Sequence, residues 1–476
     1  MKKVRVRIAP SPTGDPHVGT AYIALFNYVF AKKHSGDFII RIEDTDRERS
    51  TKDSEKLILD YLSWLGLNWD EGPYRQSDRR EIYYRYAMEL VEKGVAYKCY
   101  CSEERLGRLK EKQRRENLPP GYDGKCRDLI NSEENEGKKF VVRLKVPRQG
   151  NTIVKDAIRG DVIFENVKID DQVLLKSDGF PTYHLANVVD DHLMNISHVI
   201  RAEEWIPSTP KHILLYEAFG WELPVWVHMP LLRNRDKSKI SKRKNAVSLE
   251  YYHDEGFLKE ALLNFLALMG WSLDGKTEIF NMDDMIEKFE WKSVALGSPI
   301  LDVEKLKWIN RTYIREYDLD ALMELLKPFY MPIYGEILDK EFLKKIVDGQ
   351  RERSDTLKEL AENIGVFIRE PQFFFDQLTD EDKKKAINIL KEETASEVLK
   401  QFENEIDKVE YSPGAIKEML LTLKERLSLP LSKIFPPLRI LISGMMRGNE
   451  MSQLIFLFGK KEVIRRINSM KSLMEN

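Results

Sequence analysis

Two short segments far apart in the chain carry residues that suit phosphate binding. In the first, three prolines and Gly14 follow an apolar strand pattern, and His17 and Gly19 lie where a helical pattern begins. The amino end of a helix presents unpaired N–H groups and a partial positive charge, which favour an anion. Gly19 has no side chain, so a flat base can approach the backbone there. The pattern predicts a phosphate-binding loop, with a structural cap at His17 as the alternative.

The second segment is strongly basic. It reads Lys239-Ile240-Ser241-Lys242-Arg243-Lys244, and it is preceded by Arg233, Arg235 and Lys237. Several cations on one loop can hold the outer phosphates of a nucleotide and compensate the charge that develops as a phosphoryl bond breaks. A solvated basic turn is the alternative. If both segments close over one triphosphate, they form a nucleotide-dependent catalytic site.

The cysteines of the chain are clustered in its sequence. Cys99, Cys101 and Cys126 are the only three in the chain, and an odd number in a reducing compartment argues against disulfides. Thiolates suit a tetrahedral zinc site, which needs a fourth ligand. Tyr122 and Asp128, on either side of Cys126, are the candidates for that ligand. Three unbonded cysteines that the fold packs together are the alternative.

The elements that position these residues alternate between strand and helix over the first two hundred residues. Residues 4–8 and 38–42 have strand patterns, residues 17–34 have the apolar character of a buried helix, and a further helix is expected over about 51–65. Strands joined by crossover helices form a mostly parallel sheet. The doubly wound fold built from such units binds ligands at the carboxyl ends of its strands.

Composition and length limit the classes of protein that remain. The chain has 476 residues, 42% of them hydrophobic and 32% charged, which is typical of globular proteins, and its length allows roughly three domains at about 150 residues each. The sequence contains no apolar run near the roughly 20 residues of a membrane span, and its start alternates at strand period without an apolar signal core. We therefore expect a cytoplasmic enzyme without a membrane partner. The net charge of −2 means that local basic patches must hold any polyanion.

The sequence pattern changes twice along the chain. From about residue 77 a helix, the cysteines and the charged run 103–116 precede new strand patterns, which indicates an insertion, and after about residue 313 amphipathic helices continue to the end. The expected segments are 1–76 with 192–236 as the catalytic domain, 77–191 as the insertion, 237–312 carrying the basic loop, and two helical domains at 313–370 and 371–476.

The order of the motifs resembles a known family. His17-Val18-Gly19-Thr20 and Lys239-Ile240-Ser241-Lys242-Arg243 are similar to the HIGH and KMSKS signatures of class I aminoacyl-tRNA synthetases. The blocks at 9–14, 41–46, 183–191 and 200–205 resemble the bacterial glutamyl-tRNA synthetases. The resemblance implies a Rossmann-like α/β catalytic domain with a doubly wound parallel sheet, an inserted α/β acceptor-binding domain and all-α anticodon-binding domains. It also implies ATP-dependent attachment of L-glutamate to tRNA(Glu) through a glutamyl adenylate, with tRNA(Gln) left open as a second acceptor.

The same resemblance implies roles for individual residues. His17, Thr20 and Lys242 would be catalytic, and Gly19, Lys239, Ser241 and Lys242 would bind ATP, whose Mg²⁺ is held through phosphate oxygens and water. Glutamate would contact Arg7, Ala9, Ser11, Glu43, Tyr183 and Arg201. Two carboxylates and an ammonium group need cations together with an acid, which this set contains. For Arg7 and Arg201 the alternative is a structural ion pair with Glu43, Glu203 or Glu204.

The resemblance further implies how tRNA is bound. The basic residues of the insertion (Arg105, Arg108, Lys110, Lys112, Arg114 and Arg115) would meet the acceptor end, and Arg353, at the opening of a helix, would meet the last anticodon base. Phosphate contacts are expected from Arg447, Lys460, Lys461, Arg465 and Arg466. The family variably carries a zinc at the cysteines, with histidine common at the position of Asp128. We expect a monomer, and an exposed structural arginine is the alternative at position 353.

Three other functions fit the sequence less well. A glutaminyl enzyme has an acidic residue and asparagine in place of Ser11 and Thr13, and its tail is generally built of β-barrels. A nucleotidyltransferase acting on a small metabolite has no use for a long helical tail. A catalytically silent tRNA-binding protein is disfavoured because both signatures are intact.

Overall fold

The computed structural model describes residues 3–129, 137–234, 236, 238, 247–337 and 339–475, the side chains of 473–475 excepted. The chain forms two compact units, Met1–Tyr252 with Lys259–Leu306, and His253–Leu258 with Lys307–Asn476. Lys239, Ser241 and Lys242 of the basic loop lie outside the described residues.

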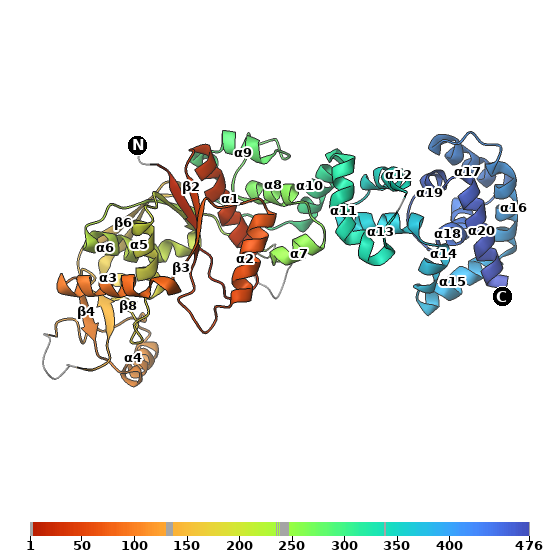
Figure 1. The fold of residues 1–476 in the computed structure, drawn as a ribbon. Coiled ribbons are helices and arrows are strands. Elements are labelled where there is room, and N and C mark those ends of the chain that lie inside the picture. The colour runs from red at the N-terminus through yellow and green to blue at the C-terminus, as the bar shows by residue number, and fades with distance from the viewer. Residues whose placement is uncertain are drawn as a thin grey trace. The chain divides into compact units, whose positions relative to one another are not determined.

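The first sheet of the first unit follows the expected strand–helix–strand pattern. Its strands β1 (Arg5–Ile8), β2 (Asp37–Ile42) and β3 (Glu71–Arg75) pair in parallel in the order β1-β2-β3. Helices α1 (Val18–Lys33) and α2 (Lys52–Trp64) make the crossovers, and α1 packs on β1 and β2 (Figure 1). Most of α1 is buried because its apolar residues cover more than one face, as the sequence predicted.

A second sheet continues beside the first. It has the order β7-β6-β10-β9, formed by β6 (Asn151–Asp156), β7 (Gly160–Glu165), β9 (His198–Ala202) and β10 (Val225–Met229). Strand β9 lies next to β1, where the backbone N–H of Ser197 donates to the carbonyl oxygen of Arg5 at 2.9 Å. Helices α5 (Tyr183–Leu193) and α6 (Thr209–Phe219) accompany these strands. The parallel pairing of β9 with β10 and of β2 with both β1 and β3 confirms the expected α/β class.

A third, antiparallel sheet belongs to the insertion. It consists of β4 (Ala96–Cys99), β5 (Val141–Leu144) and β8 (Val173–Leu175), with α3 (Arg80–Glu92) against β4 and β8 and with α4 (Glu103–Arg115) as the charged helix. The domain limits stay predictions. Within the predicted range 77–191, the β6–β7 hairpin pairs with β10 of the second sheet, whereas α5 contacts both β8 of this third sheet and α6.

The rest of the described chain is helical. Helices α7 (Leu249–Asp254), α8 (Lys259–Gly270), α9 (Met282–Lys288) and α10 (Val303–Glu316) follow β10. The tail contains α11 (Leu319–Tyr334), α12 (Lys340–Arg351), α13 (Leu357–Ile368), α14 (Pro371–Asp376), α15 (Asp380–Lys391), α16 (Glu393–Ile406), α17 (Pro413–Leu427), α18 (Leu431–Ser443), α19 (Met451–Phe458) and α20 (Lys460–Glu475). The segment 351–357 is predicted to open a helix, and α13 begins at its last residue, Leu357. Arg353 itself lies in the connection between α12 and α13, because Thr356 caps α13 by accepting from the N–H of Glu359.

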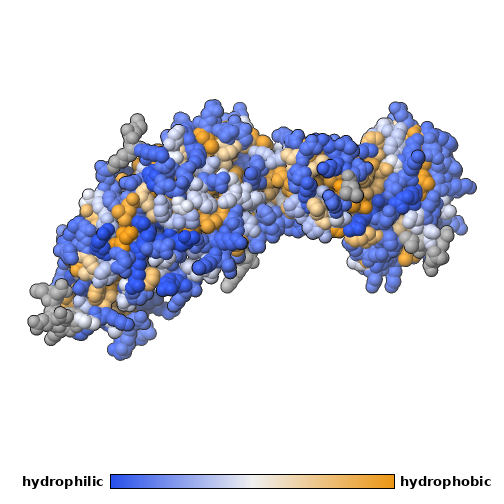
Figure 2. Space-filling view, in the orientation of Figure 1, coloured by the Kyte–Doolittle hydropathy of each residue, from blue (hydrophilic) through white to orange (hydrophobic). Residues whose placement is uncertain are grey.

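The visible surface is mainly hydrophilic, with small apolar patches scattered over it (Figure 2). Among the described residues, none of the helices is both long and apolar enough to cross a membrane.

Candidate active site

One cavity of about 530 Å³ collects the predicted substrate residues. Its walls come from the ends of β1 and β9, the start of α1 and the first turn of α5. All nine predicted residues that the structure describes line it: His17, Gly19, Thr20, Arg7, Ala9, Ser11, Glu43, Tyr183 and Arg201. The fold therefore brings the two predicted binding sets into one space.

His17 is the cap of α1, as the alternative expected, and it also faces the cavity. Its Nδ1 accepts a hydrogen bond from the backbone N–H of Gly19 at 3.0 Å. In the neutral ring the proton then sits on Nε2, so this atom is a donor. A Cβ at position 19 would lie only 3.1 Å from His17 Nδ1. A side chain at position 19 would therefore crowd the histidine ring, which would have to move by a few tenths of an ångström.

The residues on both sides of the basic loop lie at the same cavity. Before the loop, Leu231 and Leu232 line the cavity. After it, the carbonyl oxygen of Val247 accepts from the N–H of Val18 at 2.8 Å, in the first turn of α1. The chain just after the basic loop is thus joined by backbone hydrogen bonding to the first signature segment, although the two are far apart in the sequence.

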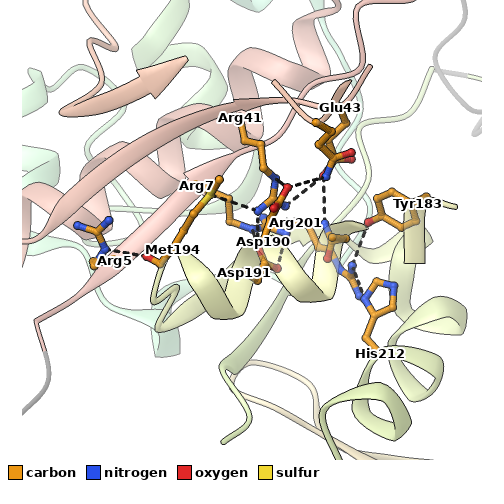
Figure 3. Close-up of polar contacts among 12 residues, drawn as sticks. Arg5, Arg7, Arg41, Glu43, Tyr183, Asp190, Asp191, Met194, Arg201 and His212 are labelled. Carbon is orange, nitrogen blue, oxygen red and sulfur yellow. Dashed lines mark hydrogen bonds and ion pairs between the residues drawn. The ribbon is translucent and has the colours of Figure 1, made fainter. Parts of the chain in front are cut away.

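A buried ionic network forms one wall. Asp191 accepts from Arg7 Nε at 3.0 Å and from an Arg41 Nη at 2.7 Å, while Glu43 accepts from Arg41 at 3.1 Å (Figure 3). Asn187 also donates to Glu43 at 3.1 Å. The two arginines hold the pKa of Asp191 below its usual range against the effect of burial, whereas burial raises the pKa of Glu43 despite Arg41 and Arg7. Arg7 does form an ion pair, but its partner is Asp191.

Arg201 lies in a different environment. Its guanidinium donates to Tyr183 Oη at 3.2 Å, Thr209 Oγ1 at 2.9 Å and His228 Nε2 at 3.1 Å, and it lies 3.4 Å from His212 Nδ1. Within the described part of the chain, all of its hydrogen-bond partners are neutral, so the alternative of an ion pair with Glu203 or Glu204 is not found. Burial lowers the pKa of Arg201, which is 5% exposed. Burying an uncompensated cation is costly unless a partner arrives, so this side of the cavity is built for an anion.

Several residues of the site had no predicted role. Arg41, Asn187, Asp190 and Asp191 complete the ionic wall, and His212 and His228 hold Arg201. Asp190 accepts from Arg79 at 2.8 Å and from Tyr83 Oη at 2.7 Å. The sequence could have indicated Asp190 and Asp191, because two adjacent carboxylates on an otherwise apolar helix face imply buried partners of opposite charge. No signal in the sequence pointed to the two histidines.

The cysteines form a cluster in the insertion. The sulfur atoms of Cys99, Cys101 and Cys126 all lie within 4.8 Å of one another. Tyr122 Oη lies 3.4 Å from Cys99 Sγ and 3.3 Å from Cys101 Sγ. Asp128 lies elsewhere, because its carboxylate is exposed and pairs with Lys145 at 3.1 Å. Three close thiols fit the soft ligand set of zinc, and of the two candidates for fourth ligand only Tyr122 is in place.

The predicted tRNA contacts differ in exposure. The basic side chains of α4 are exposed except for Arg105, which is half-buried and pairs with Asp123. Arg353 is 41% exposed and pairs with Glu450 at 3.0 Å. The expectation of a phosphate contact at Arg466 is wrong, because this side chain is buried and donates to the carbonyl oxygens of Val366 and Ile442.

Known proteins resemble this chain over its whole length. Residues 3–308 match the family described as tRNA synthetases class I (E and Q), catalytic domain, and residues 321–471 match the family described as anticodon binding domain. The chain is 50% identical to the glutamate–tRNA ligase of Fusobacterium nucleatum subsp. nucleatum, over 98% of this chain and 97% of that protein. It is 45% identical to the glutamate–tRNA ligase of Thermus thermophilus, over 98% and 99%. A crystal structure of a glutamate tRNA ligase from Elizabethkingia meningosepticum in complex with its amino acid matches with a TM-score of 0.84 at 34% identity, over 99% of this chain and all of that one.

Proposed function

The chain belongs to the glutamate–tRNA ligases of the class I tRNA synthetases, and we propose how its cavity performs the reaction of that family. The enzyme attaches L-glutamate to tRNA with ATP. The observation that supports a carboxylate substrate most directly is the buried Arg201, whose described hydrogen-bond partners are all neutral.

The amino acid binds between the two walls of the cavity. Arg201 and Arg7 take the carboxylates, and Glu43 takes the ammonium group. Arg7, Arg41 and Arg79 each pair with Asp190 or Asp191, whereas the described hydrogen-bond partners of Arg201 include no carboxylate. This favours glutamate over glutamine, because a neutral side chain leaves the buried Arg201 guanidinium without an anion.

The nucleotide binds at the start of α1, next to the point where the chain continues after the basic loop at Val247. Substrate alignment contributes about 7 to 11 kcal/mol to reactions of this type. The glutamate α-carboxylate attacks the α-phosphorus of ATP, the bond to the bridging oxygen breaks, and glutamyl adenylate and pyrophosphate result. His17 Nε2–H and the Thr20 hydroxyl stabilise the charge on the phosphate oxygens, and Lys242 neutralises the pyrophosphate. The terminal adenosine of tRNA then takes the glutamyl group and AMP leaves.

Charging assays test the amino acid. Radiolabelled glutamate and glutamine are offered with purified tRNA(Glu) and purified tRNA(Gln) in separate reactions. We expect charging with glutamate alone. Charging with glutamine alone would refute the assignment of the substrate.

The choice of tRNA is assigned to Arg353. Its guanidinium is exposed enough to reach a splayed base, and Glu450 holds it in place. We expect Arg353→Gln to change the ratio of glutamate charging on tRNA(Glu) and tRNA(Gln). The matched control is Arg426→Gln, another exposed arginine in an ion pair, with Glu405 at 2.9 Å. An equal effect of both variants would show that Arg353 reads no base.

Zinc is proposed for the cysteine cluster, with Cys99, Cys101, Cys126 and Tyr122 as ligands. The ion would tie β4 to the segment that follows α4, a structural role without a part in the reaction. Metal analysis of the purified protein and of Cys126→Ser tests it. The site is supported if the wild-type protein contains one zinc ion per chain and Cys126→Ser contains none. It is contradicted if the wild-type protein is fully stable without any metal. A cytoplasmic location and a monomeric state stay predictions.

A further inference from the structure

We propose that Asp156 and His228 form a buried hydrogen-bond chain that orients the Arg201 guanidinium for glutamate. Neither residue lines the cavity, so both are positioning residues that act through Arg201. This inference rests on the proposed function, because it assigns Arg201 to a carboxylate of the substrate. Figure 3 shows the far end of the chain, where Arg201 meets Tyr183 and His212.

Asp156 is held firmly at the end of β6. Its Oδ1 accepts from the N–H groups of Ile158 and Arg159, each at 3.0 Å. Its Oδ2 accepts from the backbone N–H of His228 at 3.1 Å and lies 2.6 Å from His228 Nδ1. Burial alone would raise the pKa of Asp156, but these hydrogen bonds keep it below its usual range. The group is therefore an ionised acceptor at neutral pH.

The ionised carboxylate determines which nitrogen of His228 carries the proton. A carboxylate only accepts, so Nδ1 must be the donor in this contact. Burial lowers the pKa of His228 to about 4, so the ring is neutral at pH 7. A neutral ring with its proton on Nδ1 leaves a lone pair on Nε2. That lone pair accepts from Arg201 Nε at 3.1 Å.

The other side of Arg201 follows the same rule. Arg201 only donates, so His212 Nδ1, which lies 3.4 Å from Arg201 Nη1, is an acceptor and His212 Nε2 carries the proton. That proton is directed at His184 Nδ1, 3.1 Å away. Burial keeps the pKa of His212 well below its usual range and lowers that of His184 to about 4, so both rings are neutral.

The result is a cation that is fixed in position and still uncompensated. Tyr183, Thr209, His212 and His228 take four of the five N–H groups of Arg201, which leaves one N–H for the substrate. A carboxylate directly on Arg201 would fix it equally well but would occupy the charge that glutamate needs. The intervening imidazole of His228 separates the charge of Asp156 from the guanidinium while transmitting its orientation.

Steady-state kinetics of three histidine variants test the chain. His228→Phe removes the acceptor, and we expect the KM for glutamate to rise about tenfold, the loss of roughly one hydrogen bond to a charged group, with the KM for ATP within twofold of the wild type. His228→Gln offers an amide oxygen to Arg201 and is expected to restore most of the affinity. The matched control is His198→Phe on the neighbouring strand β9, whose ring contacts Ser197 and Phe30 instead. Equal KM values for glutamate in His228→Phe and His198→Phe would overturn the proposal.

The protonation state itself can be observed in the unmodified enzyme. Nitrogen NMR of ¹⁵N-histidine-labelled protein is expected to show His228 with its proton on Nδ1. In Asp156→Asn we expect the side-chain amide to donate to His228 Nδ1 instead. The ring proton then lies on Nε2, where it points at the N–H of Arg201 and the hydrogen bond between them is lost. A proton on Nε2 in the wild type would overturn the proposal whether or not a variant folds. A wild-type enzyme that fails to charge tRNA with glutamate refutes the proposed function. Normal charging by the wild type, together with an unchanged KM for glutamate in His228→Phe, refutes only the hydrogen-bond chain from Asp156 through His228 to Arg201.

Discussion

Replacing Arg201 with methionine removes the proposed anchor of the substrate carboxylate while keeping a side chain of similar length. The guanidinium is 5% exposed and faces the cavity between β1 and β9. Because its described partners are neutral acceptors, the substitution leaves no unpaired carboxylate behind. The effect should therefore fall on the binding of glutamate.

The size of the effect follows from the hydrogen bonds. Four of the five N–H groups of Arg201 are used inside the protein, so one remains for the substrate. One hydrogen bond to a charged group contributes about 1.5 to 3 kcal/mol. At about 1.36 kcal/mol for each factor of ten, the KM for glutamate should rise about 10- to 160-fold.

The assay is aminoacylation at saturating ATP and tRNA, with glutamate varied. The KM for ATP should stay within twofold, because Arg201 is assigned only to the amino acid. Arg85→Met is the matched control, since Arg85 is exposed on α3 beside Tyr86 and distant from the cavity lining. A KM for glutamate that Arg201→Met leaves unchanged, in a protein with a normal unfolding curve, refutes the assignment.

Three further predictions follow from the site. Gly19→Ala places a Cβ 3.1 Å from His17 Nδ1, so the ring must shift and adenylate formation should fall at least tenfold with helix content unchanged by circular dichroism. Burial raises the pKa of Glu43 above its ordinary value. Since only the ionised carboxylate binds the ammonium group, affinity for glutamate is present above this pKa and is lost as the pH falls through it. Glu43→Gln should therefore abolish the acid limb of the pH profile of glutamate affinity. Asp191→Asn leaves two buried guanidinium groups with weaker compensation and should lower the free energy of unfolding by about 3 to 5 kcal/mol in urea.

Each of these has a result that contradicts it. Full activity in Gly19→Ala would mean that the cap at His17 is not needed for the reaction. An acid limb that persists in Glu43→Gln would belong to another group. The pKa of Asp191 is lowered in the fold, so its stabilisation is present above the ordinary pKa of an aspartate and is lost as pH falls through the folded value. An Asp191→Asn variant with the wild-type dependence of stability on pH would exclude this contribution.

The sequence by itself determined the local elements and supplied the proposal for the substrate residues. The alternating Val6 and Ile8 lie in β1, the run predicted as a buried helix over 17–34 forms α1 (Val18–Lys33), and the tail has the expected helical periodicity. These are properties of neighbouring residues, because period and capping depend on short range. The resemblance of the motifs to a known family pointed to residues that line one cavity. Periodicity alone does not show that these residues belong together.

Tertiary structure decided the partners of those residues. Arg7 and Asp191 are 184 positions apart and meet at 3.0 Å, and Arg201 finds His228 from the next strand instead of a neighbouring glutamate. The spacing of Tyr122 and Asp128 from Cys126 likewise did not show which one reaches the thiols, whereas the fold places Tyr122 there. Charge compensation in a buried site depends on which distant side chains arrive at the same point, and the pairing of strands, not the spacing of residues along the chain, sets that point.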